Sequence, residues 1–264
     1  MRVNAGVKQK AGNLAWQAVL PLGVVTLWWV WSAQAHSLYF PPLSRVMVAF
    51  KNTWFGVRFV HNAVPSLFNL AIGYVVGTGL GIGLGVVIGL VKAIEWLLSP
   101  LIEFGRALPP PAILPFAILL LGIGTNMKVG IISFGIFFVI LLNTVDGVRA
   151  VEPTLRDVGR VYRLAPARRI VAIVLPAASP QIIAGMRTAV SLGLLMMIVS
   201  EMVASTSGIG FFTLQAQQNF DFPHMWAGMI LLAVLGYVLN LAFDFFERRI
   251  LFWHQGITKG TTQP

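Results

Sequence analysis

The sequence contains no cysteine and little acidic charge. Its 264 residues include 9 Asp and Glu against 19 Lys and Arg, and charged side chains make up 11% of the chain, where soluble domains carry about 25%. The missing cysteines exclude disulfides, thiolate metal sites, thiol nucleophiles and iron–sulfur clusters. With 57% hydrophobic residues, the chain is neither a soluble globular domain nor a disordered segment. The composition therefore predicts an integral membrane protein.

Catalytic and nucleotide-binding motifs are missing too. The sequence holds no G-x-x-x-x-G-K-[ST], no H-E-x-x-H and no G-x-S-x-G, and its 4 histidines are scattered. These absences argue against ATP binding by this chain, against metalloprotease chemistry and against serine-hydrolase chemistry. We therefore predict no catalytic residue, no metal site and no cofactor within the chain.

Six segments are long and apolar enough to cross the membrane, for which about 20 mostly apolar residues are needed. They cover residues 14–32, 67–91, 97–121, 129–145, 177–204 and 226–246. The first has an alternative interpretation as a cleaved signal peptide, because Ala33-Gln34-Ala35 resembles a cleavage site, although its apolar run exceeds the ~7–15 residues of a signal core. The sequence predicts an all-α polytopic membrane protein with about six transmembrane helices.

The basic residues are distributed unevenly between the connecting segments. If the basic N-terminus is inside, Arg45, Lys51, Arg58 and Lys128 fall outside, Arg106 and Arg187 fall within spans, and the other 13 of the 19 Lys and Arg are cytoplasmic. The positive-inside rule then places both termini in the cytoplasm. The net charge of +10 follows from topology, so no nucleic-acid partner is predicted, and the tail at 254–264 receives no role.

Glycine recurs at every fourth position of the second span. Gly73, Gly77, Gly81, Gly85 and Gly89 form this ladder, and Gly79 and Gly83 lie close to the same stripe. A helix face without Cβ atoms lets a neighbouring backbone approach closely, as in small-xxx-small packing of membrane helices. We interpret the ladder as a helix-packing surface.

The third span is interrupted by prolines. Pro109-Pro110-Pro111 and Pro115 remove backbone donors and must break or kink the helix. Just before them, Glu103 and Arg106 are spaced i,i+3 and can form an ion pair on one face. Either this pair is structural, or Arg106 and Pro109 line a pathway through the membrane.

The fifth span contains two ionisable residues, Arg187 and Glu201. They are 14 residues apart, about 21 Å along a helix, and cannot pair with each other. Intramembrane charges are candidates for function, so Arg187, Glu201 and the neighbouring Met197 are candidate pathway or gate residues. The alternative for Glu201 is a structural hydrogen-bonding role. We expect Glu201 to lie near the outer end, where water reaches it.

The longest cytoplasmic polar segment, residues 146–176, connects the fourth and fifth spans. Pro153 and Pro166 each suit the first position of a short helix, and Pro176 leads into the membrane. The segment resembles the EAA loop of binding-protein-dependent ABC transporter permeases, in which E-A-A, three residues, Gly, nine residues and I-x-L-P follow one another. The matching positions are Asp157, Val158 and Gly159, then Arg163 at the place of the glycine, then Ile173, Leu175 and Pro176.

Other parts of the chain extend this resemblance to the permeases of the nitrate, sulfonate, taurine and bicarbonate importers. They are Arg106-Ala107-Leu108-Pro109, Pro115, Gly122-Ile123-Gly124, Asn143-Thr144, Ser200-Glu201-Met202 and Gly208-Ile209-Gly210. The resemblance implies one permease domain over residues 1–264 with the type I ABC importer fold, located in a bacterial inner membrane. It also implies that Asp157 to Pro166, including Leu164 and Ala165, form a coupling helix that docks on an ATPase.

Further expectations from the resemblance concern partners and cargo. It implies a second permease subunit, most simply a homodimer, two cytoplasmic ATPase subunits that bind ATP and Mg, an extracytoplasmic solute-binding protein, and surrounding membrane lipid. The cargo is expected to be a small anion, moved inward by alternating access.

Two other functions were weighed. An ion-coupled secondary carrier or channel needs intramembrane carboxylates for coupling, and Glu201 is nearly alone in that role. A membrane-embedded enzyme needs paired polar residues at membrane depth, which the sequence does not offer.

Overall fold

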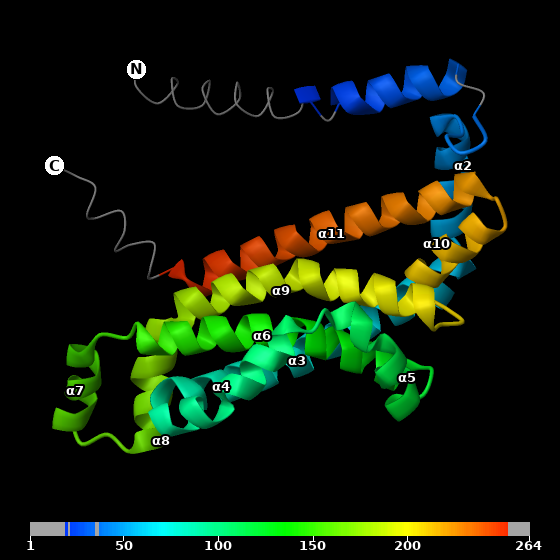
Figure 1. Ribbon diagram of the computed structural model, residues 1–264. Helices are drawn as coiled ribbons and strands as arrows, with labels where there is room; N and C mark the ends of the chain where they lie inside the picture. The colour runs from blue at the N-terminus through cyan, green and yellow to red at the C-terminus, as the bar shows by residue number, and fades with distance from the viewer. Residues whose placement is uncertain (1–18, 21, 35–36, 253–264) are drawn as a thin grey trace, which may run out of the picture. The chain divides into compact units, whose positions relative to one another are not determined.

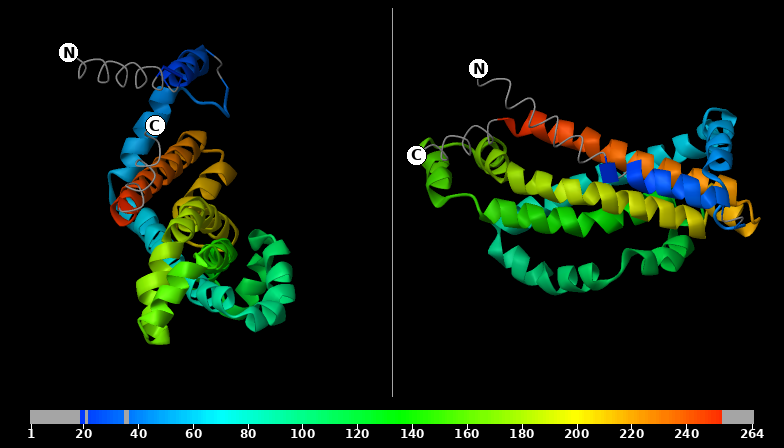
Figure 2. Two further views of the ribbon diagram at one scale, coloured as in Figure 1. Left: turned by 90° about the vertical axis from the view of Figure 1, so that its left-hand side faces the viewer. Right: turned by 90° about the horizontal axis from the view of Figure 1, so that it is seen from above.

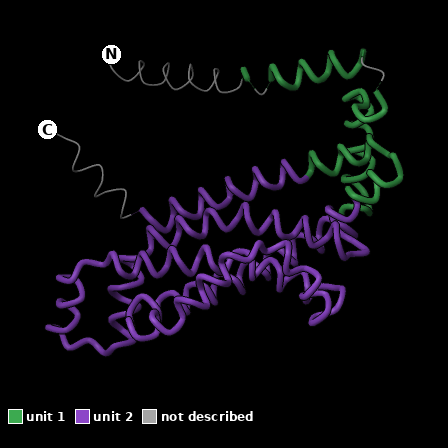
Figure 3. The backbone as a smooth tube through the Cα atoms, in the orientation of Figure 1, with its two compact units in different colours: residues 1–59, 213–231 green, residues 60–212, 232–264 purple. Residues whose placement is uncertain are grey.

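The computed structural model describes residues 19–20, 22–34 and 37–252, and these residues form helices and connecting turns without any strand. The predicted tail at 254–264 lies outside them. The chain divides into two compact units, drawn in separate colours in Figure 3: residues 1–59 with 213–231, and residues 60–212 with 232–264. That the whole chain is one permease domain stays a prediction.

Three long helices form the core of the second unit. They are α3 (Val64–Leu90), α6 (Thr125–Arg149) and α9 (Leu175–Val203), and α6 packs against both of the others along its length (Figures 1 and 2). The buried side chains of α6 include Ile132, Ile136 and Ile140, all without exposed surface. A central helix surrounded by others explains why α6 is the most buried of the candidate spans.

The glycine ladder of α3 is confirmed as a packing surface. A Cβ atom added to any of its five glycines would lie within 3.0 Å of a side chain of α6. The contacted residues of α6 also recur at every fourth position. The α6 residues are Ile132, Ile136, Ile140, Thr144 and Val148. In addition, Ser133 Oγ donates a hydrogen bond to the carbonyl of Gly73 over 3.0 Å. The assignment of Gly79 and Gly83 to this stripe is wrong, because a Cβ at either position meets nothing within 4 Å.

The prolines of the third span break it in two, as predicted. Helix α4 (Lys92–Ala107) ends before Pro109, a 3-10 turn covers Pro110–Ile113, and α5 (Leu114–Leu121) follows, with a bend of 91° between the two parts. Glu103 and Arg106 pair through Oε2 and Nε at 2.8 Å, which confirms the ion pair expected from their spacing.

The segment between α6 and α9 forms two short helices that begin at the expected prolines. They are α7 (Pro153–Val161) and α8 (Pro166–Arg169), and a π-helical turn, η3 (Ile170–Val174), leads into α9. Because α8, η3 and α9 form one candidate span from Pro166 to Val203, this helix is longer than the predicted 177–204. Both α7 and α8 lie at the same end of the second unit (Figure 1).

The first unit is formed by residues 22–34, α2 (Leu43–Trp54) and the parts of α10 (Ile209–Gln218) and α11 (Phe222–Ile250) that fall within it. Indole N–H groups hold it together: Trp54 donates to the carbonyl of Ala227 over 3.1 Å, and Trp226 to that of Tyr39 over 3.0 Å. The rings of Trp28 and Trp226 lie 4.9 Å apart.

Four helices of the described residues can cross a membrane, or five if the bent pair is one span. They cover Phe59–Leu90, Lys92–Ala107 with Pro110–Leu121, Thr125–Arg149, Pro166–Val203 and Phe222–Ile250. The first predicted span, 14–32, begins outside the described residues. The prediction of an all-helical, polytopic membrane fold is confirmed.

Candidate functional site

Helix α7 carries three apolar side chains that remain exposed. Leu155, Val158 and Val161 are spaced i,i+3,i+6, and 43%, 47% and 78% of their surfaces are exposed. A helix normally buries its apolar face against its own protein. An apolar face left outside a short surface helix fits a helix that docks into another protein.

The side of α7 that carries Gly159 packs on α8 and η3. Gly159 is buried, and a Cβ added there would lie 2.8 Å from Ile173 and 3.1 Å from Arg169. Glycine at this position therefore lets α7 approach the start of the fifth span closely.

Arg163 has a left-handed backbone conformation, with φ of +50°. This region suits glycine, because a side chain there strains the backbone. The position where the EAA loop has glycine is thus a true left-handed turn, although this chain places arginine in it. Leu164 closes the turn by donating its N–H to the carbonyl of Gly159 over 3.1 Å.

The remaining loop residues fall at helix boundaries. Ala165 precedes α8, which Pro166 begins, and Leu175 and Pro176 begin α9. Asp157 lies on α7 and binds Arg160 through a contact of 2.8 Å, with both side chains more than half exposed. The structure therefore brings all the predicted coupling residues together at one end of the second unit.

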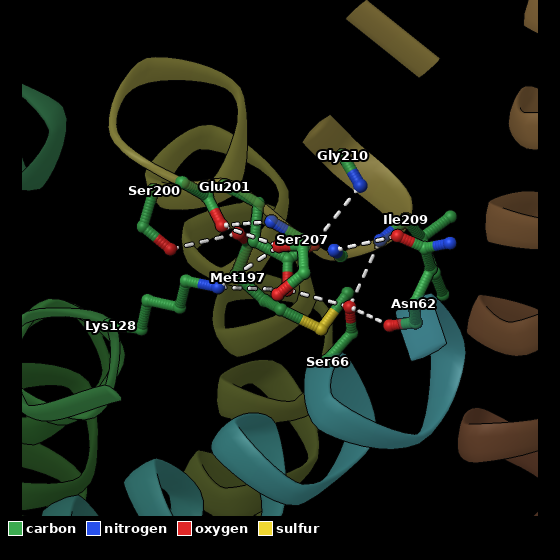
Figure 4. Close-up of polar contacts among 11 residues, drawn as sticks. Asn62, Ser66, Lys128, Met197, Ser200, Glu201, Ser207, Ile209 and Gly210 are labelled. Atoms are coloured by element: carbon green, nitrogen blue, oxygen red, sulfur yellow. Dashed lines mark hydrogen bonds and ion pairs between the residues drawn. The ribbon is translucent and has the colours of Figure 1, made fainter. Parts of the chain in front are cut away.

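A second candidate site is a buried polar node at the other end of α9. The carboxylate of Glu201, which has no exposed surface, accepts a hydrogen bond from Ser66 Oγ over 2.6 Å and another from the N–H of Gly210 over 3.0 Å. Figure 4 shows these groups converging from α3, α9 and the start of α10. The expectation that water reaches Glu201 is wrong, because the turn after α9 folds back over the carboxylate.

That turn is itself held in place by the node. Ser66 Oγ accepts the N–H of Ile209 over 3.0 Å, and Asn62 Oδ1 accepts that of Gly208 over 3.1 Å. Gly208 has φ of +127°, and a Cβ added to it would collide with the carboxyl group of Glu201. Two independent constraints, backbone conformation and close approach, therefore require glycine here.

Lys128 completes the node, and its predicted place on the outer side of the membrane stays a prediction. It lies in the first turn of α6 with only 5% of its surface exposed. Its ammonium group donates to the carbonyl of Ser207 over 3.1 Å and lies 4.0 Å from Glu201 Oε1. A buried charge needs a partner, and the carboxylate and the carbonyl supply one each.

The other candidate pathway residues do not join the node. Met197 is buried one turn before Glu201, Arg106 and Pro109 lie at the bend after α4, and Arg187 pairs with Asp244 and Glu247 of α11. Of the five candidates, Met197 lies one turn from Glu201 and Arg106 lies three residues before Pro109, whereas Arg187 pairs with α11.

Sequence reasoning missed Asn62, Ser66 and the role of Lys128 in the node. The first two are single polar residues near the start of an apolar helix and resemble ordinary caps. Lys128 follows Gly124 by four residues, and no local pattern there indicates a carboxylate partner elsewhere in the chain. Among the described residues, no group of three His, Asp or Glu could hold a metal ion.

Comparisons with known proteins agree on one family. The model of the family described as "binding-protein-dependent transport system inner membrane component" matches residues 77–252. The aliphatic sulfonates transport permease protein SsuC of Escherichia coli is 33% identical over 89% of this chain and 90% of its own length. The bicarbonate transport system permease protein CmpB of Synechococcus elongatus is 31% identical over 71% of this chain and 68% of its own.

Solved structures show the same fold. A chain from the MetNI methionine ABC transporter, in an inward-facing conformation, superposes with a TM-score of 0.62 at 18% identity, covering 72% of this chain and 94% of that chain. The predicted fold of an ABC importer permease is thereby confirmed.

Proposed function

The chain belongs to the family of inner membrane components of binding-protein-dependent transport systems, and on this premise we propose that it forms the membrane pathway of an ATP-driven importer for a small anion. The relatives SsuC and CmpB are named for aliphatic sulfonates and bicarbonate, both of which are small and negatively charged. Their shared chemistry supports an anion as the cargo.

The observation that carries the proposal is the outward apolar face of α7. We propose that this face docks on a cytoplasmic ATPase subunit, which binds ATP and Mg, and that the chain itself hydrolyses no ATP. Since α7 is joined to α6 and, through α8 and η3, to α9, a displacement of α7 is transmitted directly to two of the three core helices. Dimerisation of the ATPase subunits would then shift the permease between inward-open and outward-open states.

The remaining assembly follows from this arrangement. We propose a second copy of the chain as the other half of the pathway, an extracytoplasmic binding protein as the source of substrate, and cytoplasmic N- and C-termini in a bacterial inner membrane.

Substrate selection by the binding protein is supported by the cavity of about 350 Å3 between α3, α9 and α11, which is lined by apolar side chains apart from Tyr74. The hydroxyl of Tyr74 already donates to the carbonyl of Met186, so the cavity offers an anion no free donor.

Val158 gives the sharpest test of docking. Val158→Asp places a charge in the outward face of α7, whereas Val158→Leu keeps that face apolar and serves as the matched control. With the ATPase and binding protein from the same source in liposomes, we expect Val158→Asp to abolish sulfonate- or bicarbonate-stimulated ATP hydrolysis and copurification of the ATPase, and Val158→Leu to retain both. Full ATPase binding by the Asp variant would contradict the proposed docking face.

A further inference from the structure

A pocket of about 250 Å3 lies between α7, α8, η3 and the end of α3. Three arginines line one part of it, Arg156 and Arg160 from α7 and Arg169 from α8. Leu90 at the end of α3, together with Ile170, Ile173 and Val174 of η3, lines the rest. The pocket is therefore cationic on one side and aliphatic on the other.

The cationic side has more positive charge than its carboxylates balance. Asp157 pairs with Arg160, whereas Arg169 has no ion pair with any described residue. Arg156 uses one nitrogen to donate to the carbonyl of Val148 over 2.5 Å, and its Nε is buried without a hydrogen-bond partner in the described part of the chain. A buried guanidinium donor left unpaired is costly, so this pocket favours an anionic ligand.

The aliphatic side indicates what kind of anion this is. Leu90 is the last residue of one candidate span, and Ile170, Ile173 and Val174 lie near the start of another, so the pocket is located where two helices leave the hydrocarbon. Basic pockets between helices at this depth bind lipid headgroups. A free inorganic anion would leave the aliphatic wall facing water, whereas a phospholipid covers it with its glycerol and first methylene groups.

We propose that Arg156, Arg160 and Arg169 bind the phosphate of an anionic phospholipid, whose apolar part lies against Leu90 and η3. This site is separate from the docking face, because Leu155, Val158 and Val161 do not line the pocket. A bound lipid would therefore support α7 from the membrane side and leave its outer face accessible.

Neighbouring arginines provide a matched pair for the test. Arg169 lines the pocket, whereas the adjacent Arg168 is exposed and does not. The full chain, purified in detergent, is mixed with phosphatidylglycerol or with phosphatidylcholine of the same acyl chains, and bound lipid is counted by native mass spectrometry. We expect the unmodified chain and Arg168→Gln to prefer phosphatidylglycerol, and Arg169→Gln to bind it about fivefold less well, the effect of one basic residue at an anionic surface.

Two further measurements distinguish lost lipid binding from unfolding, and a bound phospholipid from a bound inorganic anion. Arg160→Gln, whose side chain is 69% exposed and is dispensable for packing, should weaken phosphatidylglycerol binding to a similar extent, with an unchanged unfolding temperature. Inorganic phosphate in large molar excess should leave the bound lipid in place. Equal binding by the Arg168 and Arg169 variants, or displacement of the lipid by phosphate, would overturn the proposal.

Discussion

At the scale of single residues, Glu201 illustrates how an intramembrane charge is accommodated. The sequence left open whether it gates a pathway or forms hydrogen bonds. Its complete burial favours the hydrogen-bonding role in this conformation. Its two oxygens accept from Ser66 and Gly210, so it ties α9 to the start of α3 and to the start of α10.

Substituting Glu201 separates the contribution of charge from that of hydrogen bonding. Glu201→Gln retains one acceptor oxygen but directs an NH2 group at a donor, and we expect a loss of about 1–3 kcal/mol in the free energy of unfolding. Glu201→Leu leaves Lys128 buried without its carboxylate and should cost about 3–5 kcal/mol. Thermal unfolding followed by tryptophan fluorescence measures both.

A matched control for this series is Glu103→Gln, since the side chain of Glu103, which forms an ion pair with Arg106, is 58% exposed. We expect its effect to stay within about 1 kcal/mol. If Glu201→Leu were as stable as this control, the node would not stabilise the fold.

The backbone conformation of Arg163 predicts a substitution that raises stability instead of lowering it. Since φ is +50°, Arg163→Gly should relieve strain and raise stability by up to about 1 kcal/mol. Tyr162 is also exposed but has φ of −76°, so Tyr162→Gly should lower stability by about 0.5–1 kcal/mol through lost backbone restriction. Unfolding temperatures of the two variants should therefore shift in opposite directions, and a shared direction would contradict the strain argument.

At the scale of helices, the contact of α3 with α6 depends on one repeated spacing. Glycines on one helix meet Ile132, Ile136 and Ile140 on the other at the same four-residue interval. Lipid supplies no hydrophobic force between two membrane helices, so close backbone packing is the main source of their association.

Two glycines of α3 distinguish packing from helix propensity. Gly77→Ala introduces a Cβ that would lie 2.6 Å from Ile136 and 2.8 Å from the carbonyl of Ser133, and overpacking of this kind costs about 1–3 kcal/mol. Gly79→Ala enters open space and should be neutral or stabilising by up to about 1 kcal/mol. Detergent titration of the unfolding transition compares them, and equal losses would show that the ladder is not specific.

At the scale of the whole molecule, the lack of cysteine becomes an experimental advantage. Single cysteines introduced at Lys51 and Arg160 have no background thiol, and a membrane-impermeant maleimide should label Lys51→Cys from outside and Arg160→Cys only after permeabilisation. The physical reason is the uneven distribution of basic residues between the loops. Labelling of both from outside would contradict the proposed topology.

Local signals in the sequence were enough to predict most elements of the fold. Prolines at 109–111 predicted the break after α4, Pro153 and Pro166 predicted the short helices, and the glycines at every fourth residue predicted the packing face of α3. Contacts between distant segments were beyond reach, because nothing near Lys128 or Ser66 in the sequence identifies Glu201 as their partner. The pattern of apolar and polar residues in α7 also did not show which side of the helix is exposed, because that depends on where α8 and η3 pack.

The distance along the chain between α3, which carries the glycine ladder, and its partner α6 has a consequence for synthesis. Gly73 and Ser133 are joined by a hydrogen bond across 60 residues, and a ribosome adds about 5–20 residues per second. For roughly 3–12 s, α3 therefore resides in the bilayer with its glycine ladder facing lipid, before α6 has been made. During that interval the nascent segment is open to the small-residue faces of other polypeptides, so faithful biogenesis depends on the insertion machinery keeping it apart until α6 arrives.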